Sequence, residues 1–187
     1  MRKTKIGVMD FHGSVDITDP CYDKDVWCRM NNVKISEGEY ACYVWRHTDK
    51  GKYEDGTPYS YLLVGAIGIY RNGDIPRQKD MEEIGSIGVD AGLAGFFHNK
   101  PDYSDEEWGR FCDRVRNGDA WLIEDGFYSS SGYGDGCYGV YAYKQDGAIT
   151  SPSPSFHPHR HNTFHRQAGK RYYGTCRPSP GNNNTYH

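Results

Sequence analysis

One apolar run near the middle of the chain constrains the fold more than any other stretch. Residues 84–97 (IGSIGVDAGLAGFF) hold six large apolar side chains and four glycines, but only one charged residue, Asp90. This composition is typical of a buried strand, in which glycines mark bulges or the close approach of another backbone. A buried carboxylate must be hydrogen-bonded, paired, metal-bound or protonated, because an unpaired buried charge is very costly. We therefore predict a core strand with a site carboxylate at Asp90.

Several other segments have the alternation of apolar and polar residues, or the aromatic and β-branched content, that favours strands. We predict strands over residues 5–9, 13–18, 33–35, 40–46, 59–70, 120–124 and 137–143. The strands at 40–46 and 59–70 are expected to pair antiparallel, and the second is followed by an Asn72-Gly73 turn.

One amphipathic helix is predicted from Ser104 to about Asn117. Ser104 stands three residues before Glu107, which is the spacing of a capping box at a helix N-terminus. Four apolar residues then recur at the helical period and form one stripe: Trp108, Phe111, Cys112 and Val115. The predicted fold class is therefore α+β, a mostly antiparallel, sandwich-like β-sheet with this helix packed on it.

The end of the chain differs in composition from the rest. Residues 151–187 contain no Asp or Glu and five Lys or Arg, so the first 150 residues carry 17 basic and 25 acidic residues, a net charge of −8. The Asp146-Gly147 turn should begin a returning hairpin strand, but two prolines follow at 152 and 154, and proline cannot donate to a central ladder. We predict one globular β-rich domain over residues 1–149. Residues 150–187 are expected to be a basic, Pro/Ser/His-rich tail that is disordered or non-native.

Charge and hydropathy exclude two classes of partner. An acidic body argues against nucleic-acid binding, because Lys and Arg contacts to phosphates supply most of that affinity. No segment approaches the roughly 20 apolar residues that span a bilayer, and no apolar run follows the N-terminus as in a signal peptide. The expected location is the cytoplasm, without membrane attachment.

Four aspartates lie beside predicted strand ends or glycine turns, namely Asp16, Asp19, Asp90 and Asp135. If these carboxylates converge, they offer the oxygen ligands that Ca²⁺ or Mg²⁺ prefers. The alternative interpretation is turn chemistry, because Asp favours turns and caps through local hydrogen bonds. Asp90 is the member that turns explain least.

A second candidate site is the polar glycine loop at residues 129–136 (SSSGYGDG), which is able to offer backbone amides to an anion or a nucleotide phosphate. It is not a P-loop, since it lacks a Gly-Lys-Ser/Thr ending and no helix follows it. The plain alternative is a flexible hairpin loop. The candidate ligand-binding residues are Asp90, Asp135, Tyr133 and Ser131.

Five short motifs follow one another over residues 13–149, and their order and spacing can be compared with those of known families. They are Asp19-Pro20, Gly38-Glu39-Tyr40, Gly88-Val89-Asp90-Ala91-Gly92, Gly134-Asp135-Gly136-Cys137-Tyr138 and Asp146-Gly147. In these motifs the chain resembles the bacterial and phage family labelled domain of unknown function 4241. The resemblance implies no established activity, and it implies an apolar strand after the Asp-Gly turn. This sequence departs from the family at that strand, which is a second reason to expect residues 150–187 to be foreign to the fold.

The acidic body and the 16 tyrosines of the chain favour a non-enzymatic binding or interaction module of a bacterial or phage cytoplasm. Its expected partner is a protein or a small ligand. A metal-assisted hydrolase around Asp90 is the alternative, and it requires the four carboxylates to meet in one cleft. A weaker alternative is nucleotide binding at the loop of residues 129–136.

Overall fold

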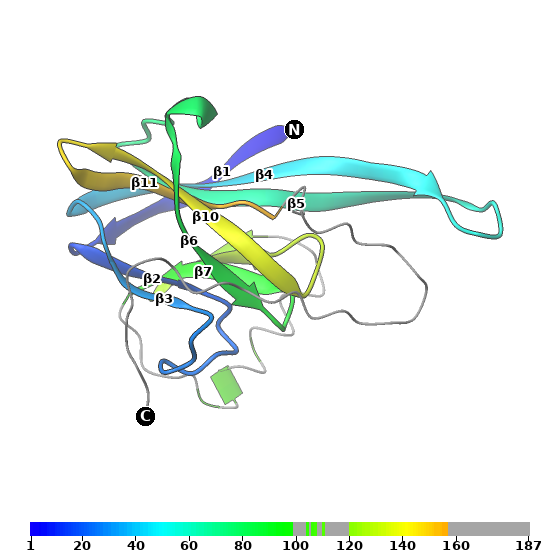
Figure 1. Ribbon diagram of the computed structural model, residues 1–187, viewed down its shortest axis with the longest axis horizontal. Helices are drawn as coiled ribbons and strands as arrows, with labels where there is room; N and C mark the ends of the chain where they lie inside the picture. The colour runs from blue at the N-terminus through cyan, green and yellow to red at the C-terminus, as the bar shows by residue number, and fades with distance from the viewer. Residues whose placement is uncertain (99–103, 105, 108–109, 111–119, 157–187) are drawn as a thin grey trace.

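A computed structural model of the chain describes residues 1–98, 104, 106–107, 110 and 120–156 (Figure 1). Residues 106, 107 and 110 are helical. The other elements of the described residues are strands and one 3-10 helix, in the order β1 (Arg2–Phe11), β2 (Ser14–Thr18), β3 (Met30–Lys34), β4 (Gly38–Lys52), β5 (Pro58–Arg71), η1 (Gln78–Asp80), β6 (Glu82–Val89), β7 (Leu93–Phe97), β8 (Ala120–Ile123), β9 (Gly126–Ser130), β10 (Gly136–Gln145) and β11 (Ala148–Pro154). The prediction of a mostly antiparallel β fold is confirmed.

The strands form three antiparallel sheets instead of one sandwich-like sheet. Their strand orders are β1-β4-β5, β11-β10-β6 and β3-β2-β7-β9-β8. All three sheets contribute to one hydrophobic core, represented by the fully buried Val44, Phe96 and Val140. The first two sheets meet where Ala66 of β5 bridges Ser155 after β11, and the Phe156 N–H donates to the Gly65 carbonyl at 2.8 Å.

The prediction that the last hairpin ends at residue 149 is wrong. β11 pairs with β10 and places Pro152 opposite Ala142 and Pro154 opposite Val140. Residues 150–154 and Phe156 are buried. The prolines are accommodated because β11 is an edge strand, where a missing N–H removes no ladder bond on the open side. The folded domain therefore extends to residue 156, and residues 157–187 lie outside the described part of the chain.

The predicted amphipathic helix is not seen among the described elements, and its apolar stripe lies outside the described residues. Its expected capping box is present. The Ser104 N–H donates to the Glu107 carboxylate at 2.9 Å, and the Glu107 N–H donates to the Ser104 hydroxyl at 3.4 Å. No helix in the described part of the chain is long and apolar enough to cross a membrane.

The central run forms two strands, not one, and this changes the place of its carboxylate. Residues 84–89 belong to β6 and 93–97 to β7. Five of their six large apolar side chains are buried as predicted, and Ile84 is partly buried. Between them the chain turns, with Gly92 at a φ of 67°. Asp90 lies in this turn and is exposed, so the prediction of a buried charge there is wrong.

Candidate functional site

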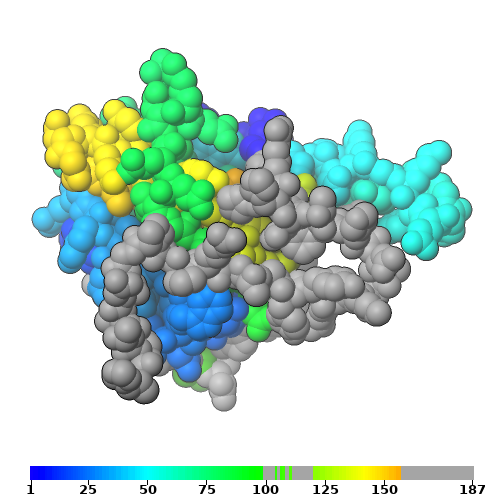
Figure 2. All heavy atoms as spheres, in the orientation of Figure 1, coloured from blue at the N-terminus to red at the C-terminus, as the bar shows by residue number. Residues whose placement is uncertain are grey.

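The hairpin of β4 and β5 is longer than the sheet that carries it. The two strands pair from Tyr40↔Arg71 to Lys52↔Pro58, whereas β1 reaches along β4 only as far as Arg46. Residues 46–64 therefore form a two-stranded ribbon, which we call the arm. The arm projects from the body in Figure 1, and Figure 2 shows its atoms standing clear of the other described residues on one side.

A tight turn closes the arm at its tip. The Tyr53 N–H donates to the Thr57 carbonyl, and the Gly56 N–H donates to the Tyr53 carbonyl, both at 2.9 Å. The Asp55 carboxylate accepts the Thr57 N–H at 2.8 Å, and this hydrogen bond lowers the pKa of Asp55. Gly56 has a φ of 83°, a backbone conformation that glycine adopts without strain.

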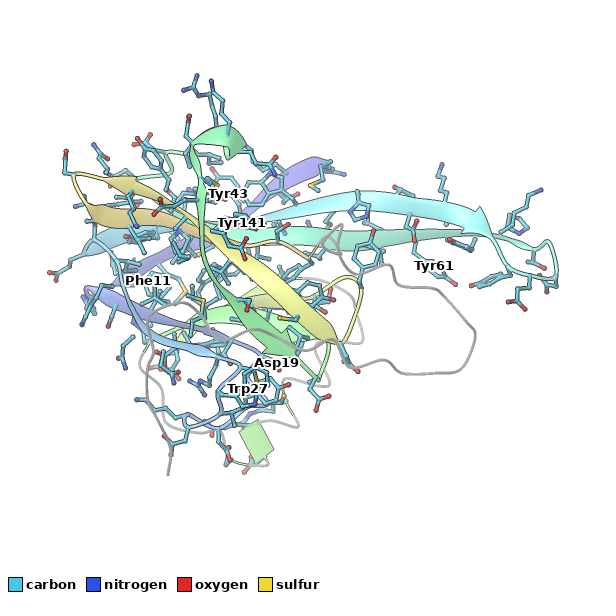
Figure 3. All side chains as sticks on the ribbon, in the orientation of Figure 1. Phe11, Asp19, Trp27, Tyr43, Tyr61 and Tyr141 are labelled. Carbon is cyan, nitrogen blue, oxygen red and sulfur yellow. The ribbon has the colours of Figure 1, made fainter. Side chains whose placement is uncertain are left out.

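Three tyrosines cluster on one face of the arm. The ring of Tyr59 lies 5.2 Å from that of Tyr53 and 5.4 Å from that of Tyr61, measured between centroids. The hydroxyls of Tyr53 and Tyr61 share a hydrogen bond. Tyr53 and Tyr61 are each 48% exposed, and Figure 3 places Tyr61 on the arm, away from Phe11 and Asp19 in the body. We call these three residues the tyrosine face.

The two strands of the arm differ in charge. The β4 strand of the arm carries four charged side chains, Arg46, Asp49, Lys50 and Lys52, whereas residues 58–64 of β5 (PYSYLLV) carry none. Leu62 lies in this uncharged strand and is 66% exposed. Natural edge strands are commonly protected by charged side chains, so the β5 edge is the unprotected edge of the arm.

The loop between β9 and β10 braces the root of the arm. His47 Nε2 and the Tyr133 hydroxyl lie 3.0 Å apart, and their rings are 5.8 Å apart. In the same loop, Gly132 lies against the backbone of Val64, where a β-carbon would collide with the carbonyl. Tyr133, which the sequence indicated as a ligand-binding residue, thus contacts the arm.

Asp19 is a buried carboxylate that holds a turn together. Its Oδ2 accepts the N–H groups of Asp90 at 2.9 Å and Ala91 at 2.7 Å, and its Oδ1 accepts the N–H of Cys21 at 3.0 Å. Burial raises the pKa of Asp19, although the three N–H donors act in the opposite direction. Asp19 thereby connects the end of β2 to the turn between β6 and β7. This role matches the alternative to a metal site, in which Asp stabilises turns through local hydrogen bonds.

Asp16 is buried in a separate cluster. Arg29 Nη2 lies 3.3 Å from its Oδ2, with the Arg29 side chain 6% exposed and that of Asp16 fully buried. The Asn32 N–H donates to Asp16 Oδ1 at 2.7 Å, and Arg29 also donates to the Tyr22 carbonyl at 2.6 Å. The carboxylate of Asp16 is thus paired with Arg29, which precedes β3, and with the backbone of Asn32 in β3.

The other two predicted ligands, Asp90 and Asp135, are exposed. Their turns are neighbours, because Gly136 pairs with Val89 across β10 and β6. In the described part of the chain, no group of three or more His, Cys, Asp or Glu residues is arranged to hold a metal ion. The four aspartates therefore do not form one cluster.

The glycine loop of residues 129–136 is held by its own hydrogen bonds. The buried Ser131 hydroxyl donates to the Gly134 carbonyl at 2.7 Å, and the Tyr138 hydroxyl donates to the same carbonyl at 2.8 Å. The hydroxyl proton of Ser131 is therefore used within the loop.

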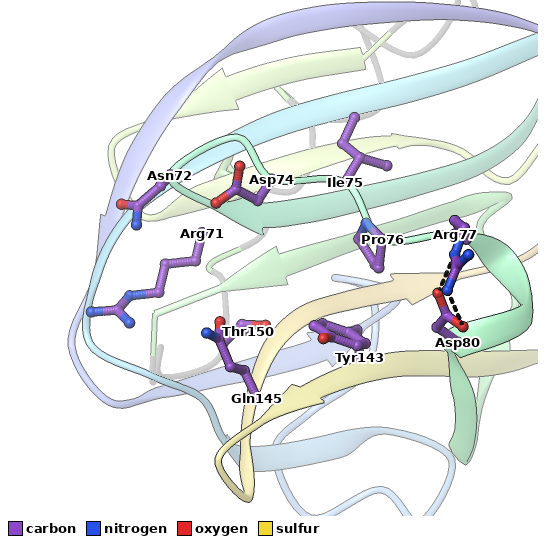
Figure 4. A pocket seen from close by; sticks show the side chains of 10 residues that line it. All are labelled: Arg71, Asn72, Asp74, Ile75, Pro76, Arg77, Asp80, Tyr143, Gln145 and Thr150. Carbon is purple, nitrogen blue, oxygen red and sulfur yellow. Dashed lines mark hydrogen bonds and ion pairs between the residues drawn. The ribbon is translucent and has the colours of Figure 1, made fainter.

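A cavity of about 340 Å³ lies between the segment after β5 and the β10–β11 hairpin (Figure 4). It is lined by Arg71, Asn72, Asp74, Ile75, Pro76, Arg77, Asp80, Tyr143, Gln145 and Thr150. Arg77 is paired with Asp80 at 2.7 Å on one side of it. Its two arginines and two aspartates balance, so the lining selects no ligand by charge.

Comparisons of the chain with family models, curated proteins and solved structures found no match. The arm and its root are thus interpreted from their own geometry.

Sequence reasoning missed the arm. It predicted strands over residues 40–46 and 59–70 and none over the residues between them, yet Asp55-Gly56 between Tyr53 and Tyr59 is a hairpin signal. The polar side chains of β4 concealed the strand because both faces of a projecting ribbon meet water, so the alternation that a half-buried strand shows is absent.

Proposed function

We propose that this protein is a non-enzymatic binding module and that its arm is the surface that binds a protein partner. One observation carries this proposal. Exposed Tyr53, Tyr61 and Leu62 lie on a projecting ribbon in which residues 58–64 of β5 carry no charge. Aromatic side chains provide large contact areas with a polar tip and are enriched at protein interfaces. Exposed apolar clusters of this kind are typical of interaction sites.

The backbone of the arm supports strand addition as the binding mode. Hydrogen-bonded and non-hydrogen-bonded residue pairs alternate along an antiparallel ribbon. Because the Tyr53 N–H donates to the Thr57 carbonyl, these two residues form a hydrogen-bonded pair, and this fixes which of the other pairs in the arm are hydrogen-bonded. By this alternation, Ser60 and Leu62 direct their N–H and C=O groups away from β4. A partner strand is able to pair with these groups, as in β-augmentation.

The enzymatic alternative receives less support from the described residues. A metal-assisted hydrolase needs the four predicted carboxylates in one cleft, whereas Asp16 is paired with Arg29 and Asp19 accepts three backbone N–H groups. The nucleotide-binding alternative needs an open anion loop, whereas Ser131 donates within its own loop.

Site-specific photo-crosslinking tests the proposal. A benzophenone-bearing residue is placed at Leu62 of the full chain, and at Lys79 on η1 as an exposed control away from the arm. After irradiation in the source cells, we expect discrete protein adducts from position 62 and none from position 79. The absence of any adduct from position 62 would overturn the proposal.

A further inference from the structure

We infer that the partner of the arm is a second copy of this chain, joined through antiparallel pairing of the two β5 edges about a two-fold axis. This inference rests on the proposed function and names the partner.

The charge pattern of the arm is the first argument. Like charges directly opposite each other on paired strands are destabilising. Two β4 edges paired antiparallel would bring Arg46, Lys50 and Lys52 of one copy near the same three cations of the other, whereas residues 58–64 of β5 meet without any charge. An uncharged edge offers no electrostatic basis for selecting a different, charged partner, but it is complementary to itself.

The backbone then selects a register. Pairing centred on Tyr61 places Ser60 opposite Leu62 of the second copy, and Leu62 opposite its Ser60. Both residues direct their N–H and C=O groups outward, so this register forms complete pairs of ladder hydrogen bonds. A register shifted by two residues would place either Pro58 opposite Leu62 or Val64 opposite Ser60. Both alternatives are poorer, because Pro58 has no N–H to donate and Gly132 already lies against the Val64 backbone.

The side chains agree with this register. A two-fold axis perpendicular to the ribbon keeps the same face of both arms on one side, so the two tyrosine faces form one continuous surface. Tyr61 then stands opposite Tyr61 of the second copy at a non-hydrogen-bonded position, where side chains approach most closely. The pairing also converts two ribbons, each marginal as an isolated hairpin, into one four-stranded sheet.

Sedimentation analysis of the full chain tests self-association. We expect a concentration-dependent dimer, and we expect Leu62→Lys to weaken its association by roughly tenfold or more, because the new charge lies at the paired edge. Thr48→Lys is the matched control, since Thr48 pairs with Leu62 across the ribbon but lies on the β4 edge. A monomer at all concentrations, or a dimer that both variants weaken equally, would overturn the inference.

Cysteine substitution tests the register. With Tyr61 on the two-fold axis, Tyr61→Cys should oxidise rapidly to a disulfide-linked dimer, because the two β-carbons lie within disulfide reach. Tyr59→Cys is the control, since Tyr59 lies opposite Leu63 of the second copy, and the parent chain is measured alongside. Equal crosslinking at positions 59 and 61 would overturn the two-fold register.

The photo-crosslinked adducts separate the two proposals. An adduct at Leu62 with twice the mass of the chain supports both the binding function and self-pairing. Adducts only with a different protein, together with a monomeric chain, would overturn self-pairing and leave the binding function standing. No adduct together with a monomeric chain would overturn both.

Discussion

Gly132 packs directly against the carbonyl group of Val64, at the place where β5 leaves the body and enters the arm. No side chain fits between the two backbones, and Gly132 has a φ of 70°, in the left-handed region that favours glycine. Together with the neighbouring contact of Tyr133 and His47, this approach fixes the root of the arm to the β9–β10 loop.

The contact of Gly132 predicts an unequal response of two nearby glycines. Gly134 has a similar φ of 85°, but a β-carbon there meets nothing within 4 Å. Gly134→Ala should therefore lower the free energy of unfolding by about 1–2 kcal/mol, the cost of a left-handed non-glycine residue. Gly132→Ala should cost clearly more, because the β-carbon displaces the Val64 backbone. Urea denaturation measures both, and equal losses would contradict the role of the close approach.

The carboxylate of Asp19 predicts a second unequal pair. Asp19→Ala leaves the N–H groups of Asp90, Ala91 and Cys21 without their acceptor, so we expect a loss of about 2–4 kcal/mol in the free energy of unfolding. Asp90→Ala removes an exposed side chain and should change stability by about 0.5 kcal/mol or less. A larger loss for the Asp90 variant than for the Asp19 variant would contradict the assignment of the structural role to Asp19.

These two aspartates also show how far the sequence predicts this fold. The apolar content of residues 84–97 correctly predicted buried strand residues around Asp90, because burial of Ile87, Val89 and Phe96 follows from composition alone. The turn at Asp90 was missed, since Gly92 was taken as a glycine within a strand. That Asp19 would accept the N–H groups of residues 71 and 72 positions later is a tertiary relationship that no local pattern contains.

The prediction for the β10–β11 hairpin was wrong for a related reason. Local propensity argues against a strand over residues 150–154, yet pairing with β10 and the donation of the Ser153 hydroxyl to the Ile67 carbonyl at 2.6 Å hold that segment in place. The arm was missed because its two strands pair with each other beyond the end of β1, and no apolar pattern marks its β4 strand. Its tyrosine face depends on contacts among Tyr53, Tyr59 and Tyr61 across a turn, which become apparent only once the register is known.

The buried pair of Asp16 and Arg29 predicts strong coupling. Arg29→Met leaves the Asp16 carboxylate buried without its cation, so we expect a loss of about 3–5 kcal/mol in the free energy of unfolding. Adding Asp16→Asn removes the uncompensated charge, and the double variant should be more stable than Arg29→Met alone. Recovery should be partial, because the bond from Arg29 to the Tyr22 carbonyl stays lost. Additive losses in a double-mutant cycle would contradict the pairing.

The ring of His98 predicts how stability depends on pH. It stacks on Phe11 with centroids 4.7 Å apart, and burial together with nearby His12 lowers the pKa of His98, while Asp125 opposes this shift. A histidine whose pKa is lowered by folding contributes its full stability above the unfolded value of about 6.5, where both states are neutral. As the pH falls below that value, the unfolded state binds a proton first and stability declines until the folded pKa is passed.

His98→Phe should therefore flatten the loss of stability between about pH 7 and pH 5, because the substituted ring keeps the stacking on Phe11 but cannot take up a proton. Comparing the two chains at each pH removes the contributions of titrating groups that do not interact with His98, including Asp19, whose raised pKa acts in the opposite direction. Urea denaturation across this range measures the difference. Parallel profiles for His98→Phe and the parent chain would show that the protonation of His98 is not linked to folding.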